Sequence, residues 1–252
     1  MQCRVYAASA IGKSHIDGDI PCQDSFAYKV IDDVLIAIVC DGAGSAAVSH
    51  LGSDFAANTL VSALADCYVT NESIHSLDAE TFKQKIQIMI GSLREKLEAQ
   101  AITENRTLAD YAATLVGVVT NANQGYFFHI GDGLAFAQHS QNPSTAFMSL
   151  PENGEYANET YFITGAEWSA HLRVTAISKP IDLLALMSDG AAPFVMNKGN
   201  SDFHRPFIDP VAHYLNSVSE LDGSSALTAT LADVRTYQIT SDDKALLIAM
   251  WV

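Results

Sequence analysis

The sequence predicts an α+β protein that folds as one large domain. Nearly continuous apolar runs, such as 34–40 and 183–188, are typical of buried strands. The segments 48–64 and 78–97 instead repeat apolar residues every three or four positions, which is typical of helices that cover a core with one face. Because the chain has 252 residues, of which 48% are hydrophobic, it can bury a sizeable core, and we expect a single domain over residues 1–252.

The charge and the cysteines exclude several classes of protein. The chain carries 29 acidic and 14 basic residues, for a net charge of −15, which argues against binding nucleic acid or an anionic membrane through a basic patch. The longest apolar run, 245–252, is shorter than the ~18 residues that span a bilayer, and residues 1–6 lack the features of a signal peptide. The four cysteines show neither metal-binding nor disulfide spacing, as is typical of reduced thiols. We therefore expect a cytoplasmic protein with no nucleic-acid or membrane partner.

In the first half of the chain, glycines and aspartates mark where the predicted elements begin and end. Gly12 and Gly18 are turn signals in a polar stretch, which we therefore expect to be a loop between two strands. Asp78 has a side chain suited to cap the N-terminus of a helix. In order, the predicted elements are strands over 4–9, 26–30 and 34–40, followed by helices over 48–64 and 78–97.

The middle of the chain predicts an antiparallel meander with tight turns at 121–125 and 131–133. In this arrangement Asp132 lies at the tip of a hairpin. Residues 139–180 are mostly polar and irregular, and so long a connection is either a functional flap or a surface excursion. The predicted elements of this half are strands over 112–119, 126–130, 134–138, 183–188 and 245–252, and helices near 210–218 and 224–236.

Aspartates recur at the ends of the predicted strands. Asp41, Asp132 and Asp189 each follow an apolar run and precede a glycine. Asp24 and Asp242 stand just before strands. A single Asp-Gly pair is usually only a turn, but acids at so many strand ends share one cleft if these ends converge. Carboxylates this close cannot all stay ionised without a counter-charge, for which Mg²⁺ or Mn²⁺ is suited. Two such ions can acidify a shared water, so the pattern favours hydrolysis of a phosphate ester.

The same residues belong to an ordered series of short motifs. They are Gln23-Asp24, Asp41-Gly42-Ala43-Gly44, Ala113-Thr114-Leu115, Gly131-Asp132-Gly133, Ser188-Asp189-Gly190 and Asp242-Asp243-Lys244. In order and spacing this series resembles the motifs of the metal-dependent type 2C protein serine/threonine phosphatases, especially a compact bacterial branch, over residues 9–252. The resemblance implies an α-β-β-α sandwich, in which two antiparallel sheets are flanked by helices and a two-metal centre lies at one end of the sheets.

The resemblance also implies roles for individual residues. Asp41 would bridge two Mg²⁺ or Mn²⁺ ions, and the backbone carbonyl of Gly42 would bind one of them. Asp189 and Asp242 would complete the shell of the other ion. Asp132, together with Asp189, would help to hold a third and weaker ion. These assignments predict a metal centre built from strand ends.

Three positions depart from the pattern of the family. Gln23 stands where glutamate is common, and Asp24 beside it would act directly or through a metal-bound water. Ala43 replaces the histidine proposed as a general acid in many eukaryotic members, so the leaving group must take its proton from water or another group. No upstream arginine matches the residue that clamps the substrate phosphate. His15 and Lys13 are the local alternatives, of which we favour His15, although neither can form the bidentate fork of arginine.

The resemblance predicts a monomeric enzyme that hydrolyses phosphoserine and phosphothreonine in proteins and so reverses a serine/threonine kinase. Asp243, where the family often has asparagine, is expected to support the ligands and not to bind metal itself. Two alternatives remain open. Gln23, Ala43 and the missing arginine also fit a regulatory or binding protein that keeps the fold but has little catalysis. The sequence equally allows a phosphatase for small phosphorylated metabolites.

Overall fold

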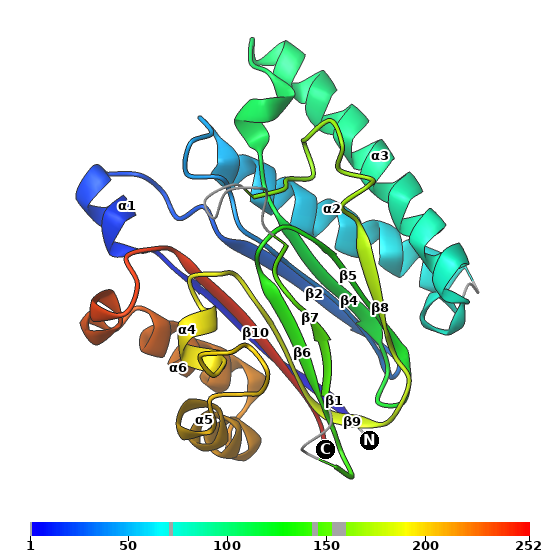
Figure 1. Ribbon diagram of the computed structural model, residues 1–252, viewed down its shortest axis with the longest axis vertical. Coiled ribbons are helices and arrows are strands. Elements are labelled where there is room, and N and C mark those ends of the chain that lie inside the picture. The colour runs from blue at the N-terminus through cyan, green and yellow to red at the C-terminus, as the bar shows by residue number, and fades with distance from the viewer. Residues whose placement is uncertain (1, 71–72, 143–145, 153–159) are drawn as a thin grey trace.

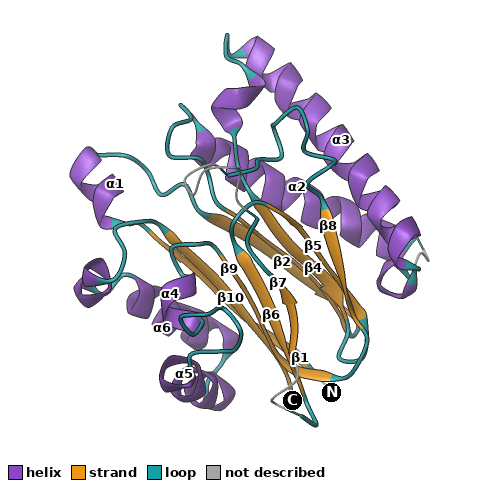
Figure 2. Ribbon diagram, in the orientation of Figure 1, coloured by secondary structure: helices purple, strands orange, loops and turns teal. Residues whose placement is uncertain are grey.

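The computed structural model describes residues 2–70, 73–142, 146–152 and 160–252. Within these ranges the strands form two five-stranded antiparallel sheets. The sheets lie face to face, and helices cover both outer faces (Figures 1 and 2). The α-β-β-α sandwich implied by the motif series is therefore confirmed.

The first sheet joins strands from both ends of the chain. Its order is β1 (Cys3–Ala10), β10 (Lys244–Trp251), β9 (Ile181–Met187), β6 (Leu134–His139) and β7 (Ala146–Ser149). Its outer face is covered by α4 (Ala192–Val195), α5 (Arg205–Ser217) and α6 (Glu220–Leu231) (Figure 1). The 3₁₀ turn η3 (Val234–Gln238) leads back to β10. Because β10 lies between β1 and β9, the residues that precede it meet the loops at the ends of both neighbours.

The second sheet is built mainly from the first half of the chain. Its order is β2 (Ser25–Ile31), β3 (Val34–Cys40), β4 (Leu115–Thr120), β5 (Gly125–Ile130) and β8 (Arg173–Ile177). Two long helices, α2 (Ser49–Val69) and α3 (Ala79–Thr103), cover its outer face (Figure 2). The 3₁₀ turns η1 (Ile74–Ser76) and η2 (Leu108–Tyr111) flank α3. Asp78 caps α3 as predicted, because its Oδ1 accepts a hydrogen bond of 3.0 Å from the backbone N–H of Thr81.

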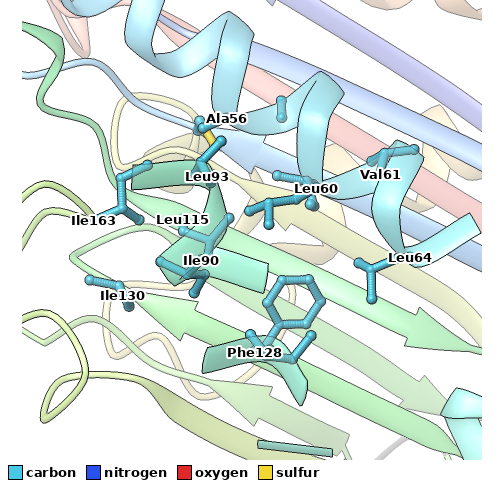
Figure 3. Packing of buried hydrophobic residues seen from close by; sticks show 14 of the residues in the cluster. Ala56, Leu60, Val61, Leu64, Ile90, Leu93, Leu115, Phe128, Ile130 and Ile163 are labelled. Atoms are coloured by element: carbon cyan, nitrogen blue, oxygen red, sulfur yellow. The ribbon is translucent and has the colours of Figure 1, made fainter. Parts of the chain in front are cut away.

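Strand β3 is apolar throughout because both of its faces are buried. Ile36 and Ile38 pack into the layer beneath α2 and α3, whereas Leu35 and Val39 point into the layer between the sheets. Figure 3 shows the outer layer, in which Leu60 of α2 and Leu93 of α3 lie over Leu115 and Phe128 of the sheet. Since side chains alternate between the faces of a strand, burial on both sides produces an unbroken apolar run.

The predicted meander is wrong after Ile130. The chain leaves β5 and enters β6, which belongs to the other sheet and pairs with β9 and β7. Asp132 therefore lies on a crossover between the two sheets and not at a hairpin tip. The reason is that β5 and β6 are both largely buried, so that their apolar patterns do not reveal which strands they pair with.

Two predicted loops contain regular structure. The polar stretch after β1 includes a short helix, α1 (Lys13–Gly18), so the prediction of a loop there is wrong. The irregular segment 139–180 contributes β7 and β8. Residues 143–145 and 153–159, which belong to the segment expected to be either a flap or a surface excursion, lie outside the described residues. None of the helices within the described ranges has both the length and the apolarity that a membrane span requires.

Candidate active site

The predicted site residues gather around a cavity of about 170 Å³ at one end of the sandwich. Its lining residues are His15, Gln23, Asp41, Gly42, Ala43, Gly44, Thr114, Asp132, Thr160, Phe162, Asp242 and Asp243. Asp189 lies in an adjoining cavity that shares Asp132 with the first. Asp24 is buried nearby, and its carboxyl acts electrostatically on Asp41. The structure therefore brings the predicted acids together from segments that are far apart in the sequence.

The motif Ala113-Thr114-Leu115 fixes the backbone of Asp41. The N–H of Thr114 donates to the carbonyl of Asp41 at 2.8 Å, and the N–H of Asp41 donates to Thr114 Oγ1 at 3.1 Å. Just beyond, the N–H of Ala43 donates to the carbonyl of Ala112 at 2.9 Å. The antiparallel pairing thus extends beyond the end of β3 and ahead of the start of β4, through a bridge between Gly42 and Ala113. It holds Asp41 in one position at the edge of the cavity.

Two glycines let the backbones around Asp189 and Asp242 approach each other. A Cβ atom on Gly190 would lie 1.9 Å from the carbonyl oxygen of Asp243, and one on Gly12 would lie 2.2 Å from the carbonyl carbon of Asp242. Both distances are far below van der Waals contact, so neither position accepts a side chain without displacing the backbone. The glycines therefore bring the end of β9 and the loop after β1 against the residues that precede β10.

Asp243 is a buried anchor for three segments of the site. Its Oδ1 accepts a hydrogen bond of 2.6 Å from the N–H of Gly12, and its Oδ2 accepts one of 2.6 Å from the N–H of Gln23. His15 Nδ1 lies 2.7 Å from Oδ2 as well. With its carboxylate fully engaged, Asp243 orients the residues around the cavity. These contacts are consistent with the expectation that Asp243 supports the metal ligands and does not bind metal itself.

Burial and neighbouring carboxylates raise the pKa values of three acids of the site, Asp24, Asp41 and Asp189. Burial, followed by the charges of neighbouring carboxylates, raises the pKa of Asp41 well above its usual range. Burial likewise raises the pKa of Asp24, against a hydrogen bond with Ser188 that lowers it. Partial desolvation, followed by the charges of Asp132 and Asp242, raises the pKa of Asp189 to about 6. Each carboxylate thus disfavours the ionisation of its neighbours, which is the situation that a bound cation relieves.

The donor atoms fit a hydrated Mg²⁺ or Mn²⁺ ion. Asp24 Oδ2 and Asp132 Oδ1 are buried and have no hydrogen-bond partner among the described residues, which is costly for a carboxylate oxygen unless it has a ligand. In the described part of the chain, no three His, Cys, Asp or Glu side chains enclose a common metal position by themselves. An ion that takes one or two carboxylates and keeps several waters does not need such an enclosure, and Mg²⁺ binds in this way.

His15 and Lys13, the two alternatives for a phosphate contact, have different surroundings. His15 lines the cavity, and its contact with Asp243 through Nδ1 leaves Nε2 as the ring atom that can meet a substrate. Lys13 instead forms an exposed ion pair of 2.6 Å with Asp17 and does not line the cavity. The geometry is consistent with the choice of His15, which stays a prediction.

Lys244 belongs to the motif Asp242-Asp243-Lys244, but the sequence alone assigns it no function. Its side chain is fully buried, and its Nζ donates to the carbonyl of Asp242 at 3.1 Å. The ammonium also lies 5.6 Å from the centre of the Tyr237 ring. The charges of Asp243, Asp24 and Asp242 act on it and favour its charged form, although burial is the larger effect and lowers its pKa. Lys244 therefore places a positive charge beside the acid cluster, and a lysine before an apolar strand was the only sign of it in the sequence.

A second group of residues missed by sequence analysis fixes Asp132. The hydroxyl of Thr160 donates to Asp132 Oδ2. Arg173 of β8 donates to the carbonyl of Gly131 at 2.9 Å and also to the carbonyl of Leu150. These contacts hold the crossover between β5 and β6 in place. No local pattern marks Thr160 or Arg173, because each acts on a residue distant in the sequence.

We expect Lys244→Met to strengthen metal binding and to destabilise the metal-free protein. The variant keeps an unbranched apolar stem but loses the positive charge that repels an incoming cation. Mn²⁺ should bind about tenfold more tightly, equal to about 1.4 kcal/mol, whereas thermal unfolding in EDTA should begin at lower temperature. Isothermal titration with Mn²⁺ measures the first effect, with the exposed Lys29→Met as the control. Unchanged or weaker Mn²⁺ binding would contradict this role for Lys244.

We expect Mn²⁺ or Mg²⁺ to raise the unfolding temperature, and to do so more strongly at pH 8 than at pH 6. Folding raises the pKa of Asp189 from 3.8 to about 6. Between these two pH values the metal-free protein binds more protons when folded than when unfolded, so its stability falls as the pH rises from one to the other. The ion competes with those protons. A metal concentration of 100 times the Kd contributes about 2.7 kcal/mol, or roughly 5–10 °C for a domain of this size. Scanning calorimetry at both pH values, with and without EDTA, tests this, and a larger shift at pH 6 would contradict it.

Comparisons of the sequence and of the structure with known proteins agree with one another. A family profile described as "Protein phosphatase 2C" matches residues 11–232. The "Serine/threonine-protein phosphatase 3" of Escherichia coli (strain K12) is 28% identical over 263 residues, which cover 100% of this chain and 99% of that protein. A solved bacterial serine phosphatase has a TM-score of 0.64 at 15% identity, over 98% of this chain and 96% of that one. The serine/threonine phosphatase Stp1 from Staphylococcus aureus has a TM-score of 0.64 at 14% identity, over 100% and 96%. At these identities the two structures show a shared fold.

Proposed function

Because the chain belongs to the protein phosphatase 2C family, we propose that the acid cluster around Asp41 hydrolyses phosphoserine and phosphothreonine in proteins with a metal-activated water. The enzyme class follows from the family and from a relative of nearly the same length that is named as a serine/threonine phosphatase. The protein is thus a protein serine/threonine phosphatase, which is a phosphoric monoester hydrolase. The observation that carries the mechanism is the convergence of aspartates from both sheets on one cavity.

We propose that these residues would hold two ions and, more weakly, a third. The carboxylate of Asp41 would bridge the first two, and the backbone carbonyl of Gly42 would bind one of them. The remaining ligands would be Asp24, Asp132, Asp189 and Asp242, with Asp24 acting directly or through a water. When bound, the ions supply an acidified water as the nucleophile. The raised pKa values of Asp24, Asp41 and Asp189 support this assignment, because these carboxylates disfavour ionisation until a cation is present.

The chain's own residues orient the reaction. Hydrogen bonds with Thr114 and Ala112 fix the backbone of Asp41 and Ala43 at the edge of the cavity. His15, held by Asp243, would contact the substrate phosphate through Nε2. Ala43 offers no proton donor, so the leaving alkoxide takes its proton from water or from another group.

We propose that residues 1–252 act as one domain, that the protein is a cytoplasmic monomer, and that its substrates are proteins phosphorylated by a serine/threonine kinase. The net charge of −15 supports a protein partner over nucleic acid, since it opposes binding to phosphate backbones. The departures at Gln23 and Ala43 keep a catalytically weak regulatory protein as the alternative.

Hydrolysis of a phosphothreonine peptide by the purified protein tests the proposal. We expect release of phosphate with Mn²⁺ or Mg²⁺ and none with EDTA. A small phosphorylated metabolite assayed in parallel distinguishes a protein phosphatase from a metabolite phosphatase. Activity that survives complete removal of metal would contradict the mechanism. No activity under any metal, with an intact fold by circular dichroism, would favour the regulatory alternative.

A further inference from the structure

Resting on the proposed phosphatase function, we propose that a groove beside the acid cluster binds the polypeptide around the phosphorylated residue, and that Lys198 selects segments with an acidic side chain there. The groove has a volume of about 600 Å³. It contains Asp189 and shares Asp132 with the smaller cavity, so it is continuous with the candidate metal centre. A phosphorylated side chain placed at the acids would therefore carry its own backbone into this groove.

The size and the lining of the groove fit a peptide better than a phosphate alone. Volumes of this order hold whole organic ligands, whereas the smaller cavity of about 170 Å³ is nearer the size of a phosphate group. Pro193 and Ile239, which are both exposed, give the groove an apolar surface. Ile239 is 58% exposed, which leaves its side chain available for contact. This lining can bury an apolar substrate side chain next to the phosphorylated residue.

Lys198 provides the charge complementarity. It is exposed on the rim of the groove, in a protein whose net charge is −15. Within the described residues, no acidic side chain forms an ion pair with it. Nearby Asp202 is instead engaged by Arg205 at 2.9 Å. An acidic side chain of the substrate could thus pair with Lys198 without displacing an internal partner.

The loop that carries Lys198 is already ordered. Asn197 Oδ1 accepts hydrogen bonds from the N–H groups of Gly199 and Ser201, at 3.2 and 3.0 Å. The loop is closed at its base, where the N–H of Asn197 donates to the carbonyl of Asp202 at 3.0 Å. Because the backbone is fixed before binding, less conformational entropy is lost when a substrate pairs with the lysine.

The test compares phosphothreonine peptides that differ only by glutamate or glutamine, placed in turn at each of the three positions on either side of the phosphothreonine. We expect the wild type to prefer glutamate at one or more positions by about two- to fivefold in kcat/KM, the size of an exposed ion pair. Lys198→Met should abolish the preference, and Lys198→Glu should reverse it. Added salt should weaken it.

Lys179→Glu is the matched control. This lysine is also exposed, but it precedes β9, whereas Asp189 follows the other end of that strand. The control makes the same change of net charge away from the groove and should keep the preference. Every peptide rate is divided by the rate of the same variant on p-nitrophenyl phosphate, which reports the state of the catalytic centre.

The outcomes separate this inference from the function on which it rests. No hydrolysis of any peptide or of p-nitrophenyl phosphate by the wild type would overturn the phosphatase function itself. Hydrolysis of all peptides without a charge preference would overturn the selection of acidic segments and leave the phosphatase function standing. A preference that persists in Lys198→Met, or that Lys179→Glu also reverses, would overturn the role of Lys198.

Discussion

Asp41→Asn is expected to reduce kcat/KM on a phosphothreonine peptide by about 10³-fold or more. The proposed bridging position brings Asp41 into contact with both ions, which together contribute several kcal/mol of transition-state stabilisation, and each 1.36 kcal/mol is a factor of ten in rate. Asparagine keeps the shape of the side chain but cannot carry the charge that holds two cations. Steady-state kinetics at saturating Mn²⁺ measure the loss.

The same variant should leave the metal-free fold intact or make it more stable. Because burial raises the pKa of Asp41, its ionised form opposes folding at neutral pH, and the neutral amide removes that cost. Asp66→Asn, an exposed substitution on α2, serves as the control and should keep full activity. If Asp41→Asn retained wild-type kcat/KM, the metal assignment would be wrong.

Asp243→Ala is expected to give the largest loss of stability among the site residues. The substitution leaves the buried N–H groups of Gly12 and Gln23 without acceptors, and each such group costs about 1–3 kcal/mol. A total near 3 kcal/mol would lower the unfolding temperature by roughly 6–12 °C for a domain of this size. Activity should fall as well, because His15 and Gln23 lose the carboxylate that orients them.

Asp243→Asn distinguishes the anchoring role from a role as a metal ligand. One oxygen of asparagine still accepts a hydrogen bond, but its NH₂ group meets a donor, so we expect a stability between those of the wild type and Asp243→Ala. Unfolding is measured in EDTA, where metal binding cannot contribute. Wild-type stability of both variants in EDTA, together with a loss of Mn²⁺ affinity, would show that Asp243 acts as a ligand and not as an anchor.

Local sequence patterns predicted most of the secondary structure but not which strands are paired. β3 and β10 are predictable because burial on both faces gives unbroken apolar runs. α3 is predictable because apolar residues recur every three or four positions after Asp78, which caps it. The change of sheet between β5 and β6 left no such mark. Pairing depends on which apolar faces meet in three dimensions, and a run that is buried on both faces is compatible with several neighbours.

The acids of the site were predictable because each stands next to an apolar strand: Asp41, Asp132 and Asp189 follow one, whereas Asp24 and Asp242 precede one. The residues that organise them were not. Lys244 is a single polar residue at the start of an otherwise apolar strand, so nothing local marks its role. Thr160 meets Asp132 only because the tertiary fold brings them together. The sequence therefore identified the groups suited to bind metal, whereas their anchors became visible only in the structure.

The acid cluster takes members from both layers of the sandwich. Asp41 follows a strand of one sheet, and Asp189 lies just beyond a strand of the other. Asp132 lies on the segment between β5 and β6, where the chain crosses from one sheet to the other. Ions held between these carboxylates, directly or through their waters, would act as a non-covalent cross-link between the sheets. Occupancy of the centre and the separation of the two sheets at this end would then be coupled, so that any force or partner that moves one sheet against the other would also change how firmly the metal is held.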